Sequence, residues 1–121
     1  MNRILLTKDN DGDMCIRINN DASALELQNL CKKIESGLTE KGYIVGSVDL
    51  IINDQFVTIS IEMLDSDYDK IGLVEYSTNE QNGDYYDLFP IKTSASNKCY
   101  QNKWDEYMSN IVDDVFDIMS K

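Results

Sequence analysis

The sequence contains no histidine. Histidine is the commonest general base, the usual partner of serine and cysteine nucleophiles, and the commonest transition-metal ligand in proteins. Its absence removes the central residue from most hydrolase and metalloenzyme mechanisms. We therefore expect no catalytic activity and no cofactor, and we assign no catalytic or cofactor-binding residue.

Other scarce features narrow the class of protein further. The three cysteines, Cys15, Cys31 and Cys99, are an odd number without C-x-x-C spacing, which argues against both a disulfide framework and a thiolate zinc site. The six glycines are scattered singly, so no glycine-rich phosphate motif is present. No apolar run reaches the length of a signal-peptide core or a membrane span. These observations predict a cytoplasmic protein that does not bind membranes.

Acidic residues are abundant and unevenly distributed. The chain of 121 residues has 22 acidic and 11 basic side chains. Residues 49–87 hold ten of the acidic residues and a single basic one, Lys70, so this third of the chain carries nine of the eleven net negative charges. A field of this sign attracts basic surfaces and repels nucleic acid and anionic lipid.

The first half of the chain predicts a β-hairpin and then a helix. Apolar runs at residues 3–7 and 14–18 flank an Asp-Gly pair, which is typical of a hairpin turn. Ser23 and Glu26 have the spacing of a capping box at a helix start. The apolar residues that follow recur with a helical period, and Lys41 and Gly42 indicate the end of the helix.

The second half predicts four strands and a closing helix. Residues 43–52, 57–63, 71–76 and 85–89 have strand patterns separated by turn residues, and Pro90 is expected to end the last strand. From Trp104 the apolar residues again follow a helical period. We therefore predict one α+β domain over residues 1–121, with the order β-β-α-β-β-β-β-α. Its single, mainly antiparallel sheet would have five or six strands with both helices packed on it.

Two D-x-D-x-D clusters suggest calcium binding as one alternative. Alternating carboxylates suit Ca²⁺, and both clusters resemble the first half of an EF-hand loop, although the required glycine and the bidentate glutamate are missing. Aspartate is also an ordinary turn residue, so the clusters need no metal, and we assign no metal ligand. The clusters are Asp9, Asp11 and Asp13, and Asp65, Asp67 and Asp69.

Tyrosines are interleaved with the acidic residues of the middle segment. Tyrosine is a rigid amphipathic residue that often anchors an interface, whereas alternate tyrosines can equally fill a core. Interleaved carboxylates and rings are what a surface competing for a nucleic-acid groove needs. The predicted partner-binding residues are Glu62, Asp65, Asp67, Tyr68, Asp69, Glu75, Tyr76, Glu80, Asp84, Tyr85 and Asp87.

These features favour a non-catalytic inhibitor that binds a basic protein, namely the nucleic-acid-binding surface of an enzyme or nuclease. The small size, the acidity and the lack of catalytic residues resemble the profile of phage anti-CRISPR and other anti-defence proteins, of nuclease immunity proteins and of nucleic-acid mimics. We expect no direct nucleic-acid binding. The alternatives are a homo-oligomeric assembly or scaffolding protein and a calcium-binding module.

Overall fold

The computed structural model describes residues 3–53, 56–78 and 83–121. It contains six strands and two α-helices in the predicted order β-β-α-β-β-β-β-α, with a short 3₁₀ helix, η1, before the last helix. The elements are β1 (Ile4–Lys8), β2 (Met14–Asn19), α1 (Ala24–Glu40), β3 (Ile44–Asn53), β4 (Phe56–Leu64), β5 (Lys70–Thr78), β6 (Tyr85–Ile91), η1 (Lys98–Tyr100) and α2 (Trp104–Met119). The predicted α+β class is therefore confirmed.

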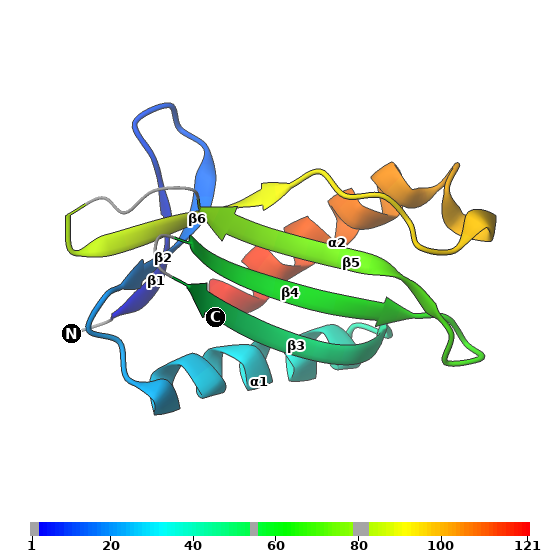
Figure 1. Cartoon of the computed structure of the whole chain (residues 1–121), viewed down its shortest axis with the longest axis horizontal. Helices are drawn as coiled ribbons and strands as arrows, with labels where there is room; N and C mark the ends of the chain where they lie inside the picture. The colour runs from blue at the N-terminus through cyan, green and yellow to red at the C-terminus, as the bar shows by residue number, and fades with distance from the viewer. Residues whose placement is uncertain (1–2, 54–55, 79–82) are drawn as a thin grey trace.

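The six strands form one open antiparallel sheet in the order β1-β2-β6-β5-β4-β3. Strands β3 to β6 follow one another as a meander, and β6 then pairs with β2 of the opening hairpin. The edges of the sheet are therefore β1 and β3. Figure 1 shows the turn of the β1–β2 hairpin projecting away from β3.

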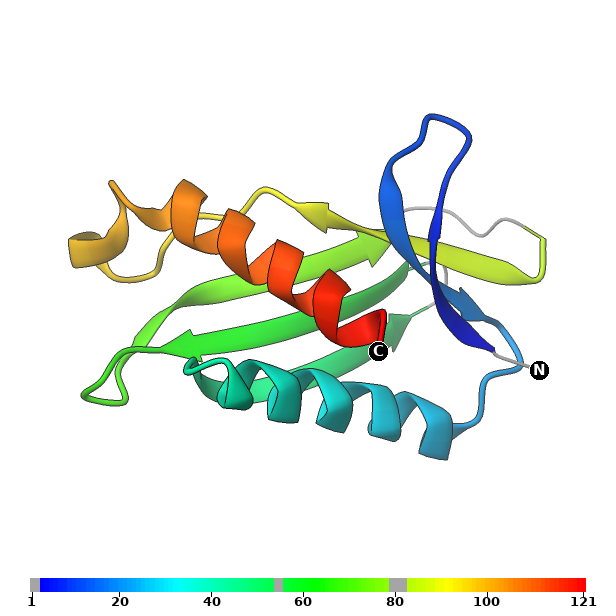
Figure 2. The ribbon, with the colours of Figure 1, turned by 180° about the vertical axis from the view of Figure 1, so that it is seen from behind.

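Both helices lie on the same side of the sheet. In Figure 1 the strands lie in front of α2, and in the reverse view of Figure 2 α2 lies in front of the strands. Helix α1 contacts β3 on one side and α2 on the other. The other side of the sheet has no helix over it within the described residues, and we call it the open face.

The alternation of side chains along β4 and β5 explains this two-sided arrangement. Residues of β4 that face the helices are buried and apolar, whereas the residues between them, such as Thr58 and Glu62, point to the open face. Paired residues share a face, so Tyr76, opposite Ile59, also points toward the helices. The buried residues of β4 are Val57, Ile59, Ile61 and Met63.

The predicted start of α1 is confirmed in atomic detail. The Ser23 hydroxyl accepts a hydrogen bond from the Glu26 amide, and the Glu26 carboxylate accepts one from the Ser23 amide, each at 3.1 Å. The second bond is the main reason why the pKa of Glu26 is lowered. At the other end, Gly42 has a positive φ of 97°, as expected of a residue that follows a helix.

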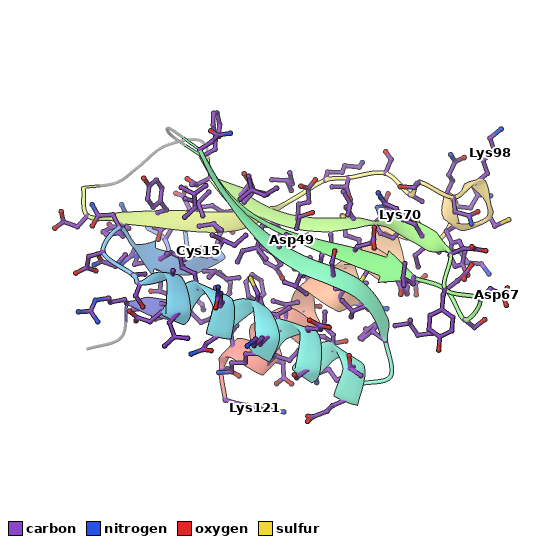
Figure 3. The ribbon with its side chains drawn as sticks, turned by 60° about the horizontal axis from the view of Figure 1, so that its bottom comes forward. Cys15, Asp49, Asp67, Lys70, Lys98 and Lys121 are labelled. Atoms are coloured by element: carbon purple, nitrogen blue, oxygen red, sulfur yellow. The ribbon has the colours of Figure 1, made fainter. Side chains whose placement is uncertain are left out.

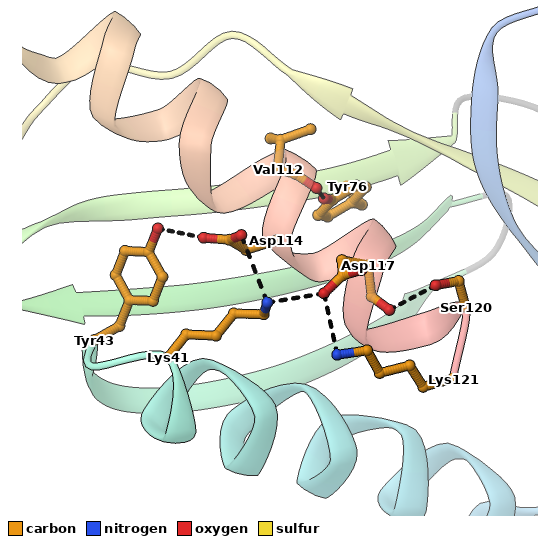
Figure 4. A network of polar contacts seen from close by, with 8 residues as sticks. All are labelled: Lys41, Tyr43, Tyr76, Val112, Asp114, Asp117, Ser120 and Lys121. Atoms are coloured by element: carbon orange, nitrogen blue, oxygen red, sulfur yellow. Dashed lines mark hydrogen bonds and ion pairs between the residues drawn. The ribbon is translucent and has the colours of Figure 1, made fainter.

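Polar contacts join the end of α1 to α2 on the helix side (Figure 4). Lys41 Nζ lies 2.8 Å from the Asp117 carboxylate, and Tyr43 donates a hydrogen bond to Asp114. Lys121 also lies near Asp117, and these two lysines lower the pKa of Asp117. Lys41 at the end of α1 thus joins α1 to α2, whereas the ammonium of Lys121 pairs with a carboxylate of α2 itself.

Strand β6 extends further than the sequence predicts. Pro90 was expected to end the strand after Phe89, but Pro90 lies opposite Tyr76 and β6 continues to Ile91. A proline removes only one backbone donor, so it is tolerated close to the end of a strand. Ala95 then forms an isolated bridge with Gly72, which keeps the chain beside β5 after β6 has ended.

Candidate protein-binding surface

Three acidic residues of the middle segment lie together on the open face. Asp49 of β3 and Glu75 of β5 are both opposite Ser60 of β4, so the three residues form one row across the sheet. The Cα atoms of Asp49 and Glu75 are two strand spacings apart, or about 10 Å. Glu62 lies in the neighbouring row, and the three carboxylates therefore share one region of the sheet.

The β4–β5 turn carries three more carboxylates. The turn is closed by a backbone hydrogen bond of 2.9 Å from the Asp65 amide to the Asp69 carbonyl. Asp65 Oδ1 accepts hydrogen bonds from the amides of Asp67 and Asp69, at 2.9 and 3.0 Å. Asp65 therefore stabilises the turn, while the side chains of Asp67 and Asp69 are exposed.

We call these six residues, Asp49, Glu62, Asp65, Asp67, Asp69 and Glu75, the acidic strip. The strip runs from the middle of the open face to the turn at one end of the sheet, with Asp67 at the turn tip (Figure 3). The described ion pairs involve acidic residues elsewhere, whose cations are Arg3, Arg17, Lys41 and Lys121. In the described part of the chain no ion pair involves a residue of the acidic strip.

Tyr68 lies within the β4–β5 turn and is the most exposed large aromatic side chain of the described residues. Its side chain is 74% exposed, and its backbone has a positive φ of 65°. Among the described non-glycine residues, no other has a positive φ. A bulky residue in this region of φ is strained, and such strain is found disproportionately at functional sites.

The structure does not bring the remaining predicted residues into the strip. Asp84 and Tyr85 lie at the start of β6, at the end of the sheet opposite to the β4–β5 turn. Tyr85 is half-buried and packs under the Arg17 guanidinium, 3.9 Å from the ring centroid. Glu80 lies outside the described residues. The acidic middle segment is therefore divided, rather than forming the single continuous surface that its charge suggests.

Two predicted residues are buried, so their placement on a partner surface is wrong. Tyr76 is fully buried on the helix side, where its hydroxyl donates a 2.8 Å hydrogen bond to the Val112 carbonyl (Figure 4) and its ring contacts Phe116 edge-on. Asp87 is 6% exposed and accepts two hydrogen bonds from Arg17, at 2.7 and 2.9 Å. Both side chains are thus used within the fold.

One residue of the acidic strip, Asp49, was not among the predicted partner-binding residues. Its sequence signal is its place between Val48 and Leu50, two apolar residues that face the helix side. By alternation Asp49 must then point to the open face. The alternation is visible in the sequence, but it places Asp49 on the open face only once the face covered by the helices is known.

Cys15 and Cys31 are not activated as nucleophiles. Burial raises the pKa of Cys15 to about 11, and burial also raises the pKa of Cys31. The thiolate is the reactive form, so a raised pKa suppresses reactivity. Cys99 is exposed at η1.

The two aspartate clusters are the remaining candidates for metal binding. Among the described residues, no group of three or more Cys, Asp or Glu side chains is arranged to hold a metal ion. The first aspartate of each cluster, Asp9 or Asp65, directs one oxygen to two backbone amides of its own turn. Those bonds are typical of aspartate in turns.

Comparisons with known proteins do not identify a relative. No protein family, no curated protein and no solved structure matches the chain. Neither of the described helices is long and apolar enough to cross a membrane.

Proposed function

We propose that this protein is a non-catalytic inhibitor that binds the cationic, nucleic-acid-binding surface of an enzyme through its acidic strip. The observation that carries the proposal is the acidic strip: within the described residues its six carboxylates have no ion pair, three of them lie on the open face and three lie in the adjoining β4–β5 turn. Such a role is the one performed by anti-defence proteins and by immunity proteins against nucleases.

The mechanism is electrostatic attraction followed by occlusion of the enzyme surface. Unpaired carboxylates keep their full field, which raises the rate of encounter with a surface of opposite charge by tenfold or more at low salt. On docking, the lysines and arginines that would hold phosphates pair with the strip instead. The same field repels nucleic acid, so the inhibitor competes with the substrate without binding it.

Tyr68 would supply the apolar contact that carboxylates cannot. Affinity at protein interfaces is concentrated in a few buried side chains, among which tyrosine is enriched. Tyr68 lies between Asp67 and Asp69 in the sequence of the turn and is exposed, so a partner that docks on this turn can contact the ring as well as the carboxylates. Tyrosine in addition stacks on arginine, the residue that commonly contacts phosphates.

A pair of matched variants tests this proposal. Asp67→Asn with Asp69→Asn removes two charges from the acidic strip, while Asp11→Asn with Asp13→Asn removes two charges from the β1–β2 turn. In both turns the first aspartate, whose side chain makes the stabilising hydrogen bonds, is left unchanged. The two variants therefore have equal net charge and comparable turns.

The measurement is affinity capture from a lysate of the native host cell, followed by competition with nucleic acid. The proposal predicts that the wild type and the β1–β2 turn variant capture the same nucleic-acid-binding protein, and that added DNA or RNA displaces it. The acidic-strip variant should capture less of it. Equal capture by the two variants, or a captured protein indifferent to nucleic acid, would contradict the proposal.

A further inference from the structure

Strand β3 is an edge of the sheet with few of the features that protect edges. It pairs with β4 on one side, and on its other side no strand is paired within the described residues. Natural edge strands are commonly short or carry lysine, proline or bulges. β3 has ten residues, Ile44–Asn53, without lysine or proline, and its one irregularity lies near its start, between Val45 and Ser47.

The other edge of the sheet is different. β1 has five residues, ends in Lys8 and follows directly on Arg3, which is paired with Asp21. Its length and charge resemble the protected edges of natural sheets. From Ser47 to the end of the strand, β3 is therefore the edge that can accept another strand.

A groove lies beside this edge, between β3 and α1, which face the viewer together in Figure 3. The groove has a volume of about 480 Å³. Its apolar lining comes from Leu27 and Cys31 of α1 and from Val48, Leu50 and Ile52 of β3. The polar residues that also border the groove are Gln28, Lys32, Glu35 and Asp49. Ile52 is 58% exposed at one end of the groove, so this apolar lining is open to a partner.

The residues of β3 that alternate with this apolar lining are more polar. By the register of β3, Ser47, Asp49 and Ile51 alternate with this lining toward the open face, and Asp49, a residue of the acidic strip, also borders the groove. A strand added beside β3 would have the same alternation, because side chains on neighbouring strands share faces. One set of its side chains would enter the groove, and the other set would lie next to Asp49.

We propose that an extended segment of the cationic partner adds to the sheet beside β3, with apolar side chains in the α1–β3 groove alternating with lysines or arginines beside Asp49. This inference rests on the proposed function and gives the partner's docking segment a chemistry. Backbone hydrogen bonds to the free edge provide the affinity, and the alternation provides the selection.

A second copy of this chain fits the edge less well. Each chain has a net charge of −11, and pairing of β3 with itself would bring two acidic strips onto one continuous face. Like charges placed opposite each other across strands are destabilising. Charge complementarity therefore selects a cationic strand.

The test uses a synthetic peptide of five Val-Lys repeats with blocked ends. Controls are a peptide of five Val-Glu repeats and a block peptide with the composition of the first, five valines followed by five lysines. The measurements are amide hydrogen exchange, resolved by residue, and the rate at which iodoacetamide alkylates Cys31. Exposed Cys99, at η1, is the internal reference thiol.

The inference predicts that the alternating Val-Lys peptide slows exchange of the outward-facing β3 amides by about tenfold or more. Alkylation of Cys31 should slow similarly while Cys99 is unchanged. Asp49→Lys should weaken peptide binding by about tenfold, whereas Asp11→Lys, an equal change of charge on the β1–β2 turn, should have little effect. The Val-Glu and block peptides should protect neither β3 nor Cys31.

Four results would overturn strand addition. Binding of the Val-Lys peptide with perturbation of the acidic strip alone would leave the proposed function standing and remove β3 as the docking edge. Equal protection by the block peptide, or no binding of any peptide, would also overturn it. Protection of β3 without peptide, together with a dimer in light scattering, would identify a second copy as the occupant.

Discussion

Tyr68 occupies in the β4–β5 turn the position that Gly12 occupies in the β1–β2 turn. Both turns have the pattern D-x-D-x-D, and in both the first aspartate accepts hydrogen bonds from the amides two and four residues later. The fourth residue has a positive φ in each, 84° at Gly12 and 65° at Tyr68. Glycine adopts this conformation without strain. For folding alone, glycine would therefore suit the fourth position of the β4–β5 turn better than tyrosine does.

Tyr68→Gly should not destabilise the fold. Relief of the positive φ contributes about 1 to 2 kcal/mol, and the greater flexibility of glycine in the unfolded chain offsets about 0.5 to 1 kcal/mol of this. We expect a free energy of unfolding equal to the wild type or up to about 1 kcal/mol higher, measured by urea denaturation.

The same variant should bind its partner more weakly. Loss of an interface tyrosine commonly costs about 2 kcal/mol or more of binding free energy, which is roughly thirtyfold in Kd. Isothermal titration with the captured partner measures this, and Tyr68→Asn provides a second small residue that tolerates positive φ. Unchanged affinity in both variants would show that the ring does not contact the partner.

Gly37 should be required for the close approach of α1 to α2. A Cβ atom added at Gly37 would stand 2.6 Å from Cδ1 of Ile118. Gly37→Ala gains about 1 kcal/mol of helix propensity but causes overpacking of about 1 to 3 kcal/mol. We expect a net loss of about 1 kcal/mol in unfolding free energy.

A second substitution separates these two effects. In an Ile118→Ala background the side chain that would collide is absent, so Gly37→Ala should become stabilising by about 1 kcal/mol. If Gly37→Ala has the same effect in both backgrounds, the glycine is not needed for helix contact.

Asp87→Asn should destabilise the protein without altering its association with a partner. The substitution weakens the two hydrogen bonds from Arg17, which lie on a largely buried carboxylate, and should cost about 2 kcal/mol. Asp84→Asn makes the same change of charge at an exposed position and should cost less than about 0.5 kcal/mol. If Asp87→Asn changed the association rate more than Asp84→Asn did, Asp87 would belong to the partner-binding surface after all.

Stability should fall at alkaline pH partly because of Cys15. Its pKa is raised by burial from 9.0 to about 11 in the folded protein. Between these values the unfolded chain loses the thiol proton and the folded chain retains it, so unfolding becomes easier as pH rises, by up to about 1.4 kcal/mol per pH unit. Below pH 9 this group has no such effect.

Cys15→Ala isolates that effect. Burial also raises the pKa values of Tyr43 and Tyr76. Because the wild type and Cys15→Ala both contain these tyrosines, their effect is the same in the two proteins. The unfolding free energy of the wild type should therefore fall more steeply than that of the variant between pH 9 and about 11. Parallel pH profiles would show that the Cys15 thiol ionises as readily in the folded protein as in the unfolded one.

Local patterns were sufficient to predict the elements of the fold. The Ser23 and Glu26 pair, and the alternation along β4, each express hydrogen bonding or burial that is decided within a few residues. Gly37 shows the limit of such reasoning. The low helix propensity of glycine predicts that Gly37 weakens α1. The structure shows that Ile118, eighty-one positions away, packs so close to Gly37 that a larger side chain would collide with it.

The candidate surface was only partly predictable for the same reason. Charge density in the sequence singled out Glu62, Glu75 and the turn acids, which are half-buried or exposed in the structure. Asp87 has the same chemistry, but its burial depends on Arg17, seventy residues earlier, through the pairing of β2 with β6. No local sequence pattern predicts that β6 pairs with β2.

The most direct test of the acidic strip is the association rate constant of the captured partner, measured against salt concentration for the two turn variants. The account predicts that Asp67→Asn with Asp69→Asn lowers the rate roughly fivefold at low salt and flattens its salt dependence. Asp11→Asn with Asp13→Asn should stay close to the wild type. Equal salt dependence in the two variants would show that net charge, rather than the acidic strip, governs association, and would contradict the account.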